Sequence, residues 1–164
     1  ASELPACMLA LDAAIVLQSA TGARMIAAED FFLGTYSTAL DEGEMIIAVE
    51  IPAIAVNQHH RFLEISRRSG DYAISGGAFV LEMDADIITA ARLAFFAVGD
   101  CAVLAGSEAL LGKPLNAETI DQVAQRVGED ITFYGDLYNG IGAKRQITKT
   151  LTRRLLAQFP GMEL

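Results

Sequence analysis

Two arginines, a glycine and an aspartate lie close together in the string Arg67-Arg68-Ser69-Gly70-Asp71. Apolar runs at residues 62–65 and 74–83 flank this string and predict strands, so we expect the charged residues where one strand turns into the next. Guanidinium groups at such a turn can bind an anion or a cofactor. The simpler interpretation is a polar hairpin loop with a local Arg–Asp ion pair, worth at most about 1 kcal/mol when exposed. The residues alone favour the hairpin loop and leave the cofactor contact open.

Two adjacent glycines, Gly76 and Gly77, interrupt the apolar run that follows. Glycine inside a strand marks a bulge or a close approach of another group to the backbone. That group could be a ligand, or it could be a helix packed against the sheet. We keep both interpretations and favour the packed helix.

The remaining candidate residues have simpler structural interpretations. His59 and His60 have no serine, cysteine or second carboxylate at a useful spacing, so we expect surface or edge histidines. Residues 41–44 are acidic but lack the ligand spacing of a calcium loop, which predicts a solvated turn. Cys7 is expected to face a core from a helix, as free cysteines commonly do. Basic residues recur along the last predicted helix and could meet an acidic partner or form a solvated face: Lys144, Arg145, Lys149, Arg153 and Arg154.

Composition excludes several classes of protein. The 164 residues carry a net charge of −9, which argues against nucleic acid as the main partner, because phosphate binding needs a cationic face. The apolar runs are too short to span a bilayer, and the N-terminus lacks a signal-peptide pattern. Two cysteines are too few for a disulfide framework, so we expect a reducing, cytoplasmic location. The sequence contains no catalytic triad, phosphate loop or dinucleotide fingerprint.

The order of predicted elements indicates an α+β fold. The first third predicts a short helix, a hairpin, one helical turn and a strand, at residues 5–11, 14–18 with 23–26, 28–32 and 44–51. Residues 52–60 have no clear period, and we place a domain boundary there. Strands are then predicted at 61–67, 74–83 and 87–98, and helices at 102–111, 117–127 and 142–159, with Asn116 as an N-cap. This order predicts a three-stranded antiparallel sheet with about three helices on one face.

The succession of these segments resembles a known family. The residues that carry the likeness are Ser2-Glu3-Leu4-Pro5, residues 30–36 (DFFLGTY), 44–52 (EMIIAVEIP), 62–74 (FLEISRRSGDYAI), 108–115 (EALLGKPL) and 151–155 (LTRRL). In this order and spacing they resemble the FAD-binding medium subunit of molybdenum hydroxylases, of the carbon monoxide dehydrogenase and xanthine dehydrogenase type. The resemblance runs through essentially the whole sequence.

The resemblance implies an electron-transfer role. In that family a molybdenum subunit hydroxylates the substrate, an iron–sulfur subunit carries the electrons, and the flavin subunit passes them through FAD to an acceptor. The resemblance implies that residues 1–53 form the last part of an α/β flavin domain and that residues 57–164 form the family's C-terminal α+β domain. It also implies the iron–sulfur and molybdenum subunits as partners of this chain.

Five residues become cofactor-binding candidates through the resemblance: Glu3, Ile46, Glu64, Arg67 and Asp71. Glu3 matches an acidic position close to the flavin, and Ile46 matches an aliphatic residue near the flavin ring. Glu64 stands at or next to a position often held by lysine. A carboxylate there disfavours an anionic reduced flavin, whereas a cation would favour it.

The family's glycine-rich loops, whose backbone N–H groups hold the FAD pyrophosphate, do not occur in this sequence. The sequence has no initiator Met and enters an apolar helix at once, so we expect it to start within a longer polypeptide, just after the second loop. Without those amides we expect the chain alone to bind FAD weakly or not at all. The alternative function is a non-catalytic interaction domain that docks partner subunits.

Overall fold

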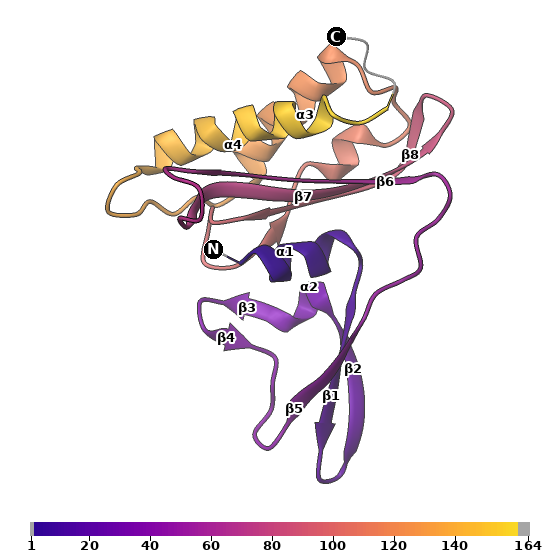
Figure 1. Ribbon diagram of the computed structural model, residues 1–164, viewed down its shortest axis with the longest axis vertical. Coiled ribbons are helices and arrows are strands. Elements are labelled where there is room, and N and C mark those ends of the chain that lie inside the picture. The colour runs from indigo at the N-terminus through magenta and orange to yellow at the C-terminus, as the bar shows by residue number, and fades with distance from the viewer. Residues whose placement is uncertain (1, 161–164) are drawn as a thin grey trace.

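The computed structural model describes residues 2–160 as two layered regions joined by an exposed connection at residues 51–57 (Figure 1). In the first region, β1 (Ala14–Ser19) pairs antiparallel with β2 (Gly22–Ala27) and with β5 (Met45–Glu50). The helices α1 (Glu3–Ala10) and α2 (Ala28–Phe31) and the short pair β3 (Phe32–Gly34) and β4 (Ser37–Thr38) complete it. The predicted helix, hairpin, helical turn and strand are all confirmed, whereas β3 and β4 were not predicted.

The second region is built on a four-stranded antiparallel sheet of order β6-β7-β8-β9. Its strands are β6 (Gln58–Ser66), β7 (Ala73–Asp84), β8 (Ile87–Phe96) and β9 (Val103–Leu104). The three long strands match the prediction, and β9 corrects the predicted three-stranded sheet. His59 and His60 lie on β6, which is an edge strand, as expected.

The predicted helix at 102–111 is wrong. Val103 and Leu104 pair with β8 as β9, and only a 3-10 helix, η1 (Ser107–Leu110), follows. Gly106 between them has φ 71°, a left-handed conformation that ends regular structure and favours glycine. A Cβ on Gly106 would lie 2.6 Å from a methyl carbon of Val127, so a tight contact with helix α3 also requires glycine here.

Two helices cover one face of this sheet (Figure 1). They are α3 (Ala117–Asp130) and α4 (Ile141–Leu156), and Asn116 caps α3 by accepting a hydrogen bond from the Thr119 N–H at 2.9 Å, as predicted. Their apolar faces and the inner face of the sheet form the main core. Side chains at 0–1 % exposure fill its centre: Phe79, Leu81, Leu93, Phe95, Val123, Leu151 and Leu155.

Helix α1 packs on the opposite face of the same sheet (Figure 1). Ala6, Leu9 and Ala10 of α1 form a second core with Val80 and Phe96, among others. The sequence predicted helices on only one face of this sheet. The position of α1 on the other face corrects that prediction. The reason is that β7 and β8 alternate apolar side chains on both faces, and the face opposite α3 and α4 needs its own cover.

The sheet glycines serve packing. A Cβ on Gly77 would come within 3.2 Å of Leu151 and Leu155 on α4, which confirms the packed-helix interpretation for this residue. A Cβ on Gly76 would lie 2.0 Å from the Phe96 ring, which occupies the space above the glycine. The Phe96 ring in turn stacks on Phe62, with ring centroids 5.6 Å apart.

Candidate functional site

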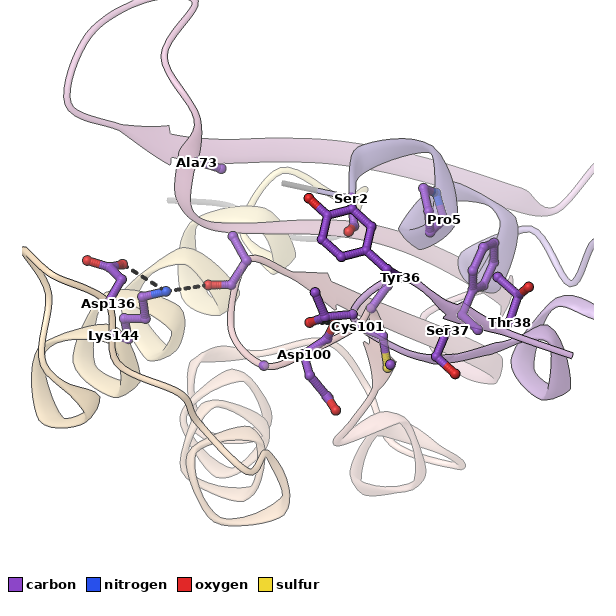
Figure 2. A pocket seen from close by; sticks show the side chains of 16 residues that line it. Ser2, Pro5, Tyr36, Ser37, Thr38, Ala73, Asp100, Cys101, Asp136 and Lys144 are labelled. Atoms are coloured by element: carbon purple, nitrogen blue, oxygen red, sulfur yellow. Dashed lines mark hydrogen bonds and ion pairs between the residues drawn. The ribbon is translucent and has the colours of Figure 1, made fainter.

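A cavity of about 550 Å³ lies where the two regions meet (Figure 2). Four segments wall it: the start of α1, the β3–β4 turn, the β8–β9 loop, and the loop that leads into α4 together with the first turn of α4. Ala73, at the start of β7, lies beside them. The lining is mixed, with small apolar groups and hydroxyls around three charged side chains: Asp100, Asp136 and Lys144.

Lys144 is the most deeply placed charge of the cavity wall. Only 8 % of this residue is exposed, although it belongs to the first turn of α4. Its Nζ donates to the carbonyl oxygen of Ala97 at 2.9 Å and lies 3.0 Å from Oδ2 of Asp136 (Figure 2). Because a buried ammonium is costly without acceptors, these two contacts offset the cost of burying the Lys144 side chain.

Asp136 is fixed as an anion by its own loop. Its Oδ1 accepts hydrogen bonds from the backbone N–H groups of Tyr138 and Asn139, both at 2.8 Å. The Tyr138 N–H is the main cause that lowers the pKa of the Asp136 carboxyl well below its usual range, and the Lys144 ammonium adds to it. The Asp136 carboxyl is therefore ionised throughout the physiological range.

The β3–β4 turn holds the facing wall. Thr35 Oγ1 donates to the carbonyl oxygen of Asp100 at 2.9 Å, which joins this turn to the β8–β9 loop. The next residue, Tyr36, has φ 55° and a fully exposed side chain. Ala97 in the opposite loop also has a positive φ, 59°. Left-handed backbone at two non-glycine residues around one cavity is uncommon and marks sites where the surroundings impose the conformation.

The charged string at residues 67–71 contacts this site indirectly. Arg67 lies 3.7 Å from Asp71, so the local ion pair forms. The Arg67 guanidinium also lies over the Tyr138 ring, 4.3 Å from its centroid. Since the Tyr138 N–H binds Asp136, the β6–β7 turn contacts the loop that orients the Asp136–Lys144 pair.

The other three cofactor-binding candidates from the family resemblance lie apart from one another. Glu3 is in the first turn of α1, where its carboxylate accepts from the Ser2 N–H at 3.1 Å, next to the cavity-lining residues Ser2 and Pro5. Glu64 lies on β6 opposite Gly76 and is half-buried. Ile46 lies on β5 in the other sheet, pairs with Leu17 and does not line the cavity.

Neither cysteine has the environment of a reactive thiol. Cys7 packs partly buried against the second core, as predicted, and burial with the nearby Glu3 charge raises the pKa of its thiol. Cys101 lines the cavity, and burial followed by the Asp100 charge raises its thiol pKa. Both thiols therefore stay protonated near neutral pH. Among residues 2–160 no cluster of histidine, cysteine and carboxylate side chains could hold a metal ion.

Most of the predicted basic stripe is paired within the chain. Lys144 is buried, Arg153 binds Asp121 at 2.6 Å, and Lys149 binds Gln125. Arg145 lies over the Phe133 ring, 5.4 Å from its centroid. Arg145 and Arg154 are exposed, and neither forms an ion pair in the part of the chain described here.

Sequence reasoning missed the residues that gather at the cavity. Tyr36, Asp100 and Asp136 were not singled out, and Lys144 was assigned to a helix surface. The string Gly34-Thr35-Tyr36 signals a turn, and Asp136 followed by Asn139-Gly140 signals an aspartate-capped turn before a helix. These signals could have located the loops. They could not have predicted that loops from both regions meet at one cavity.

Comparisons with known proteins agree with this architecture. Residues 60–159 match the model of the CO dehydrogenase flavoprotein C-terminal domain, and residues 1–54 match that of the FAD binding domain in molybdopterin dehydrogenase. The chain therefore belongs to the CO dehydrogenase flavoprotein family, the medium FAD subunits of molybdenum hydroxylases. This confirms the resemblance found in the sequence.

Individual relatives are similar at a moderate level. The glyceraldehyde dehydrogenase medium chain of Sulfolobus acidocaldarius is 30 % identical over 156 residues, which cover 94 % of this chain and 55 % of the relative. The carbon monoxide dehydrogenase medium chain of Hydrogenophaga pseudoflava is 33 % identical over 125 residues, which cover 75 % and 44 %. The chain thus spans about half the length of the curated relatives it matches.

Solved structures share the fold. Quinoline 2-oxidoreductase from Pseudomonas putida 86 superposes with a TM-score of 0.87 at 32 % identity, covering 96 % of this chain and 55 % of that one. Carbon monoxide dehydrogenase from Hydrogenophaga pseudoflava gives a TM-score of 0.88 at 30 % identity, covering 93 % and 54 %. The mixed α+β fold and the homology to medium subunits of oxidoreductases are therefore established. Among the described residues, no helix is both long and apolar enough to cross a membrane.

Proposed function

We propose that this chain is part of the flavin subunit of a molybdenum hydroxylase-type oxidoreductase, which passes electrons from iron–sulfur centres through FAD to an acceptor. The observation that carries the proposal is the match of both family models, which together account for residues 1–54 and 60–159. The division into a flavin-domain part at 1–53 and a C-terminal domain at 57–164 is part of this proposal. So is the assignment of Glu3, Ile46, Glu64, Arg67 and Asp71 as flavin neighbours.

The cavity fits one part of FAD better than the other. Flavin, when bound, supplies the two-electron oxidation and reduction. A planar ring suits the small apolar groups and exposed Tyr36 of the cavity wall. A diphosphate does not suit it, because Lys144, the one cation among the described lining residues, is already paired with Asp136, and Asp100 adds a second negative charge. We therefore infer that this chain holds the ring end, and that the pyrophosphate needs backbone amides from elsewhere.

The chain's own residues position the ring and exclude water, and none acts as general acid or base. The cysteine thiols stay protonated, and Asp136 stays ionised against Lys144. Glu64 brings a negative charge to the sheet face that α1 covers, and near a flavin it would oppose the anionic reduced form. The proposed contribution of the chain is thus geometric and electrostatic.

The proposed partners are an iron–sulfur subunit and a molybdenum subunit, in the cytoplasm. Similar proteins support this proposal because they are named as parts of assemblies. One is the nicotine 6-hydroxylase medium subunit of Paenarthrobacter nicotinovorans, 30 % identical over 96 % of this chain and 56 % of its own length. Substrate choice would lie in the molybdenum subunit and not in this chain.

An interaction domain without redox function is the second candidate, and one surface favours it. All six residues of β5 are exposed, and four are large and apolar: Met45, Ile46, Ile47 and Val49. An apolar edge strand of this kind is normally covered by further polypeptide. The basic stripe gives this candidate little support, because most of its cations are paired inside the chain.

Co-expression with iron–sulfur and molybdenum subunits of a related hydroxylase would test the proposal. We expect a stable complex, and we expect substrate-dependent reduction of an acceptor only when flavin and all subunits are present. Acceptor reduction by the isolated chain would contradict the electron-transfer assignment. A stable homo-oligomer that ignores both subunits would favour the interaction domain.

A further inference from the structure

Strand β6 is an open edge of the four-stranded sheet, and its sequence carries few of the features that normally protect such an edge. Among residues 2–160 the sheet order ends at β6, so no strand covers its outer side. Its nine residues include no proline and no lysine, and its register shift lies at the very end, between Ile65 and Ser66. A long edge without these features is a template for pairing with another strand.

The hydrogen bonding between β6 and β7 determines which backbone groups point to the open edge. The Met83 N–H donates to the carbonyl oxygen of Asn57 at 3.1 Å, one step before the first residue pair of the β6–β7 register. Because hydrogen-bonded pairs alternate along an antiparallel ladder, the N–H and C=O groups of residues 58, 60, 62 and 64 point away from β7. The carbonyl oxygen of His60 fits this pattern, since it accepts from the Arg61 guanidinium at 2.7 Å.

Three of these residues place their side chains in a row on the sheet face that carries α1. His60 and Phe62 line a shallow apolar cavity of about 250 Å³ beside α1. The Phe62 ring stacks on Phe96, yet 46 % of the residue stays exposed. Glu64 is half-buried, and its carboxylate forms no hydrogen bond or ion pair within residues 2–160. A half-buried carboxylate is costly without a donor, so this edge gains from a partner that supplies one.

The row of His60, Phe62 and Glu64 is complementary to itself. A two-fold axis through Phe62 would pair β6 antiparallel with β6 of a second copy. Phe62 then lies opposite Phe62 of the second copy, and each His60 lies opposite Glu64 of the other copy. All three positions direct their backbone groups toward the second copy, so each pair can exchange two N–H···O bonds. Aromatic pairs and imidazole–carboxylate pairs directly opposite each other stabilise an antiparallel sheet.

We propose that β6 is a self-association edge, through which two copies of the flavin-free chain join their four-stranded sheets into one continuous sheet. A second copy fits better than a strand of another protein, because the complementary groups His60 and Glu64 lie symmetrically about Phe62 within one strand. The open edge β5 lacks this property. Paired with itself about its middle, β5 would place Met45 opposite Glu50, and no opposite charges would meet.

The proposal goes beyond the proposed function and does not depend on it. In the dimer, Glu64 faces the second copy and not a flavin, so the dimer is a state of the chain without flavin at that position. An electron-transfer role in an assembled complex is compatible with a dimeric or a monomeric free chain.

Sedimentation velocity of the 164-residue chain over a concentration series measures the association, and we expect a monomer–dimer equilibrium. His60→Glu places like charges opposite each other, and Glu64→Lys removes the carboxylate from both pairs. Each variant should therefore raise the dissociation constant about 10-fold or more. An equal mixture of the two variants should recover near wild-type association. In the mixed dimer the new glutamate faces the new lysine, and the native His60 faces the native Glu64.

Matched controls separate this pairing from general effects of charge. His59→Glu makes the same change on the same strand, but its side chain points to the opposite face of the sheet. Glu42→Lys makes the same change of charge in the exposed acidic turn, and Ile47→Glu places a charge on the other open edge, β5. All three should associate as the wild-type chain does. Circular dichroism checks that every variant is folded.

Amide exchange in the wild-type chain, followed by NMR, gives a second measurement that needs no variant. The N–H groups of residues 60, 62 and 64 are unpaired at the open edge of the monomer, so they should exchange fast in dilute solution. They should become protected as the concentration rises, whereas the open-edge N–H groups of β5 should not. This result and recovery on mixing would both support the proposed dimer.

A wild-type chain that stays monomeric at millimolar concentration overturns the proposal and leaves the proposed function as it is. The proposal also fails if the mixed variants do not recover association, or if His59→Glu weakens it as much as His60→Glu. Association that is lost in Ile47→Glu and retained in His60→Glu would assign the interface to β5 instead. Protection of residues 60–64 that appears only with an added iron–sulfur subunit would mean that β6 pairs with another protein, which again contradicts the homodimer.

Discussion

Glu44 shows how a residue in an acidic turn is used. Residues 41–44 form the predicted turn, but Glu44 is not simply solvated: its carboxylate accepts two hydrogen bonds from Arg24, both at 2.7 Å, and one from the Asp41 N–H at 2.8 Å. The Arg24 bonds are the main cause that lowers the pKa of Glu44 to about 2, from an ordinary value of 4.5. Sequence spacing could not predict this pair, because Arg24 on β2 and Glu44 in the turn before β5 are 20 residues apart.

The Glu44 pair predicts a specific pH dependence of stability. Because the folded pKa is depressed, the stabilisation is complete above about pH 4.5 and is lost as the pH falls toward 2. Glu44→Gln should therefore lower the melting temperature at pH 7, and the difference from wild type should shrink between pH 4.5 and 2. Glu42→Gln is the control, since Glu42 is exposed in the same turn and forms no ion pair within residues 2–160. A difference that stays constant down to pH 2 would contradict the assignment.

Gly76 provides a second test at the scale of one residue. A Cβ there would lie 2.0 Å from the Phe96 ring, so Gly76→Ala must displace that ring and should destabilise the fold by about 1–3 kcal/mol. Urea unfolding measures the loss. Combined with Phe96→Leu, which vacates the space, the alanine should cost much less than it does alone. Additive losses in the double variant would show that the ring contact is not the cause.

At the scale of elements, hydrophobic periodicity predicted the long strands and helices because most of them bury one face in the core. It failed at residues 102–111, where Val103, Leu104 and Leu110 satisfy a helical pattern as well as a strand and a 3-10 helix. The deciding factors were the left-handed Gly106, which lies inside this segment, and the pairing with β8, which is not local in the sequence. The same limit explains why the loops around the cavity were missed.

A buried hydroxyl pair between β7 and α4 gives an asymmetric prediction. Ser75 and Thr148 are fully buried, with their oxygens 2.8 Å apart, and Thr148 Oγ1 also donates to the Lys144 carbonyl oxygen at 2.8 Å. Ser75→Ala leaves Thr148 bonded and should cost about 0.5–1.5 kcal/mol, whereas Thr148→Val strands the Ser75 hydroxyl and should cost about 1–3 kcal/mol. Chemical denaturation compares the two variants. Equal or reversed losses would mean that Ser75 finds another partner.

At the scale of the whole molecule, the resemblance of successive segments predicted the family. It did not predict how the two parts of the chain pack against each other, which the structure shows. Residues 1–53 and 57–164 were expected as parts of two domains, but α1 buries its apolar side chains on the second sheet. The spacing of apolar residues in α1 does not indicate which sheet the helix covers, because Ala6, Leu9 and Ala10 could pack on any apolar face. The cavity exists only because of this arrangement, since its walls come from both regions.

The core that α1 of the first region forms with β7 and β8 of the second predicts that the two regions stay together when the connection between them is cut. Residues 51–57 are exposed throughout, and their alanines and valine suit elastase. Arg92 on β8 donates to the Leu9 carbonyl oxygen at 2.8 Å and pairs with Asp12 and Glu29, each at 3.2 Å, so polar contacts reinforce the apolar ones. After cleavage we expect both fragments to elute together in size-exclusion chromatography.

Helix α1 itself supplies the matched pair of variants for this experiment. Leu9 is 3 % exposed and packs in the shared core, so Leu9→Ala should remove about 2–5 kcal/mol and let the cut fragments separate. Leu4 on the same helix is 71 % exposed, so Leu4→Ala should leave them associated. Separation of the wild-type fragments on cleavage would mean that the α1 contact is too weak to hold the regions together. The cavity between them would then depend on the intact connection and not on the packing of α1.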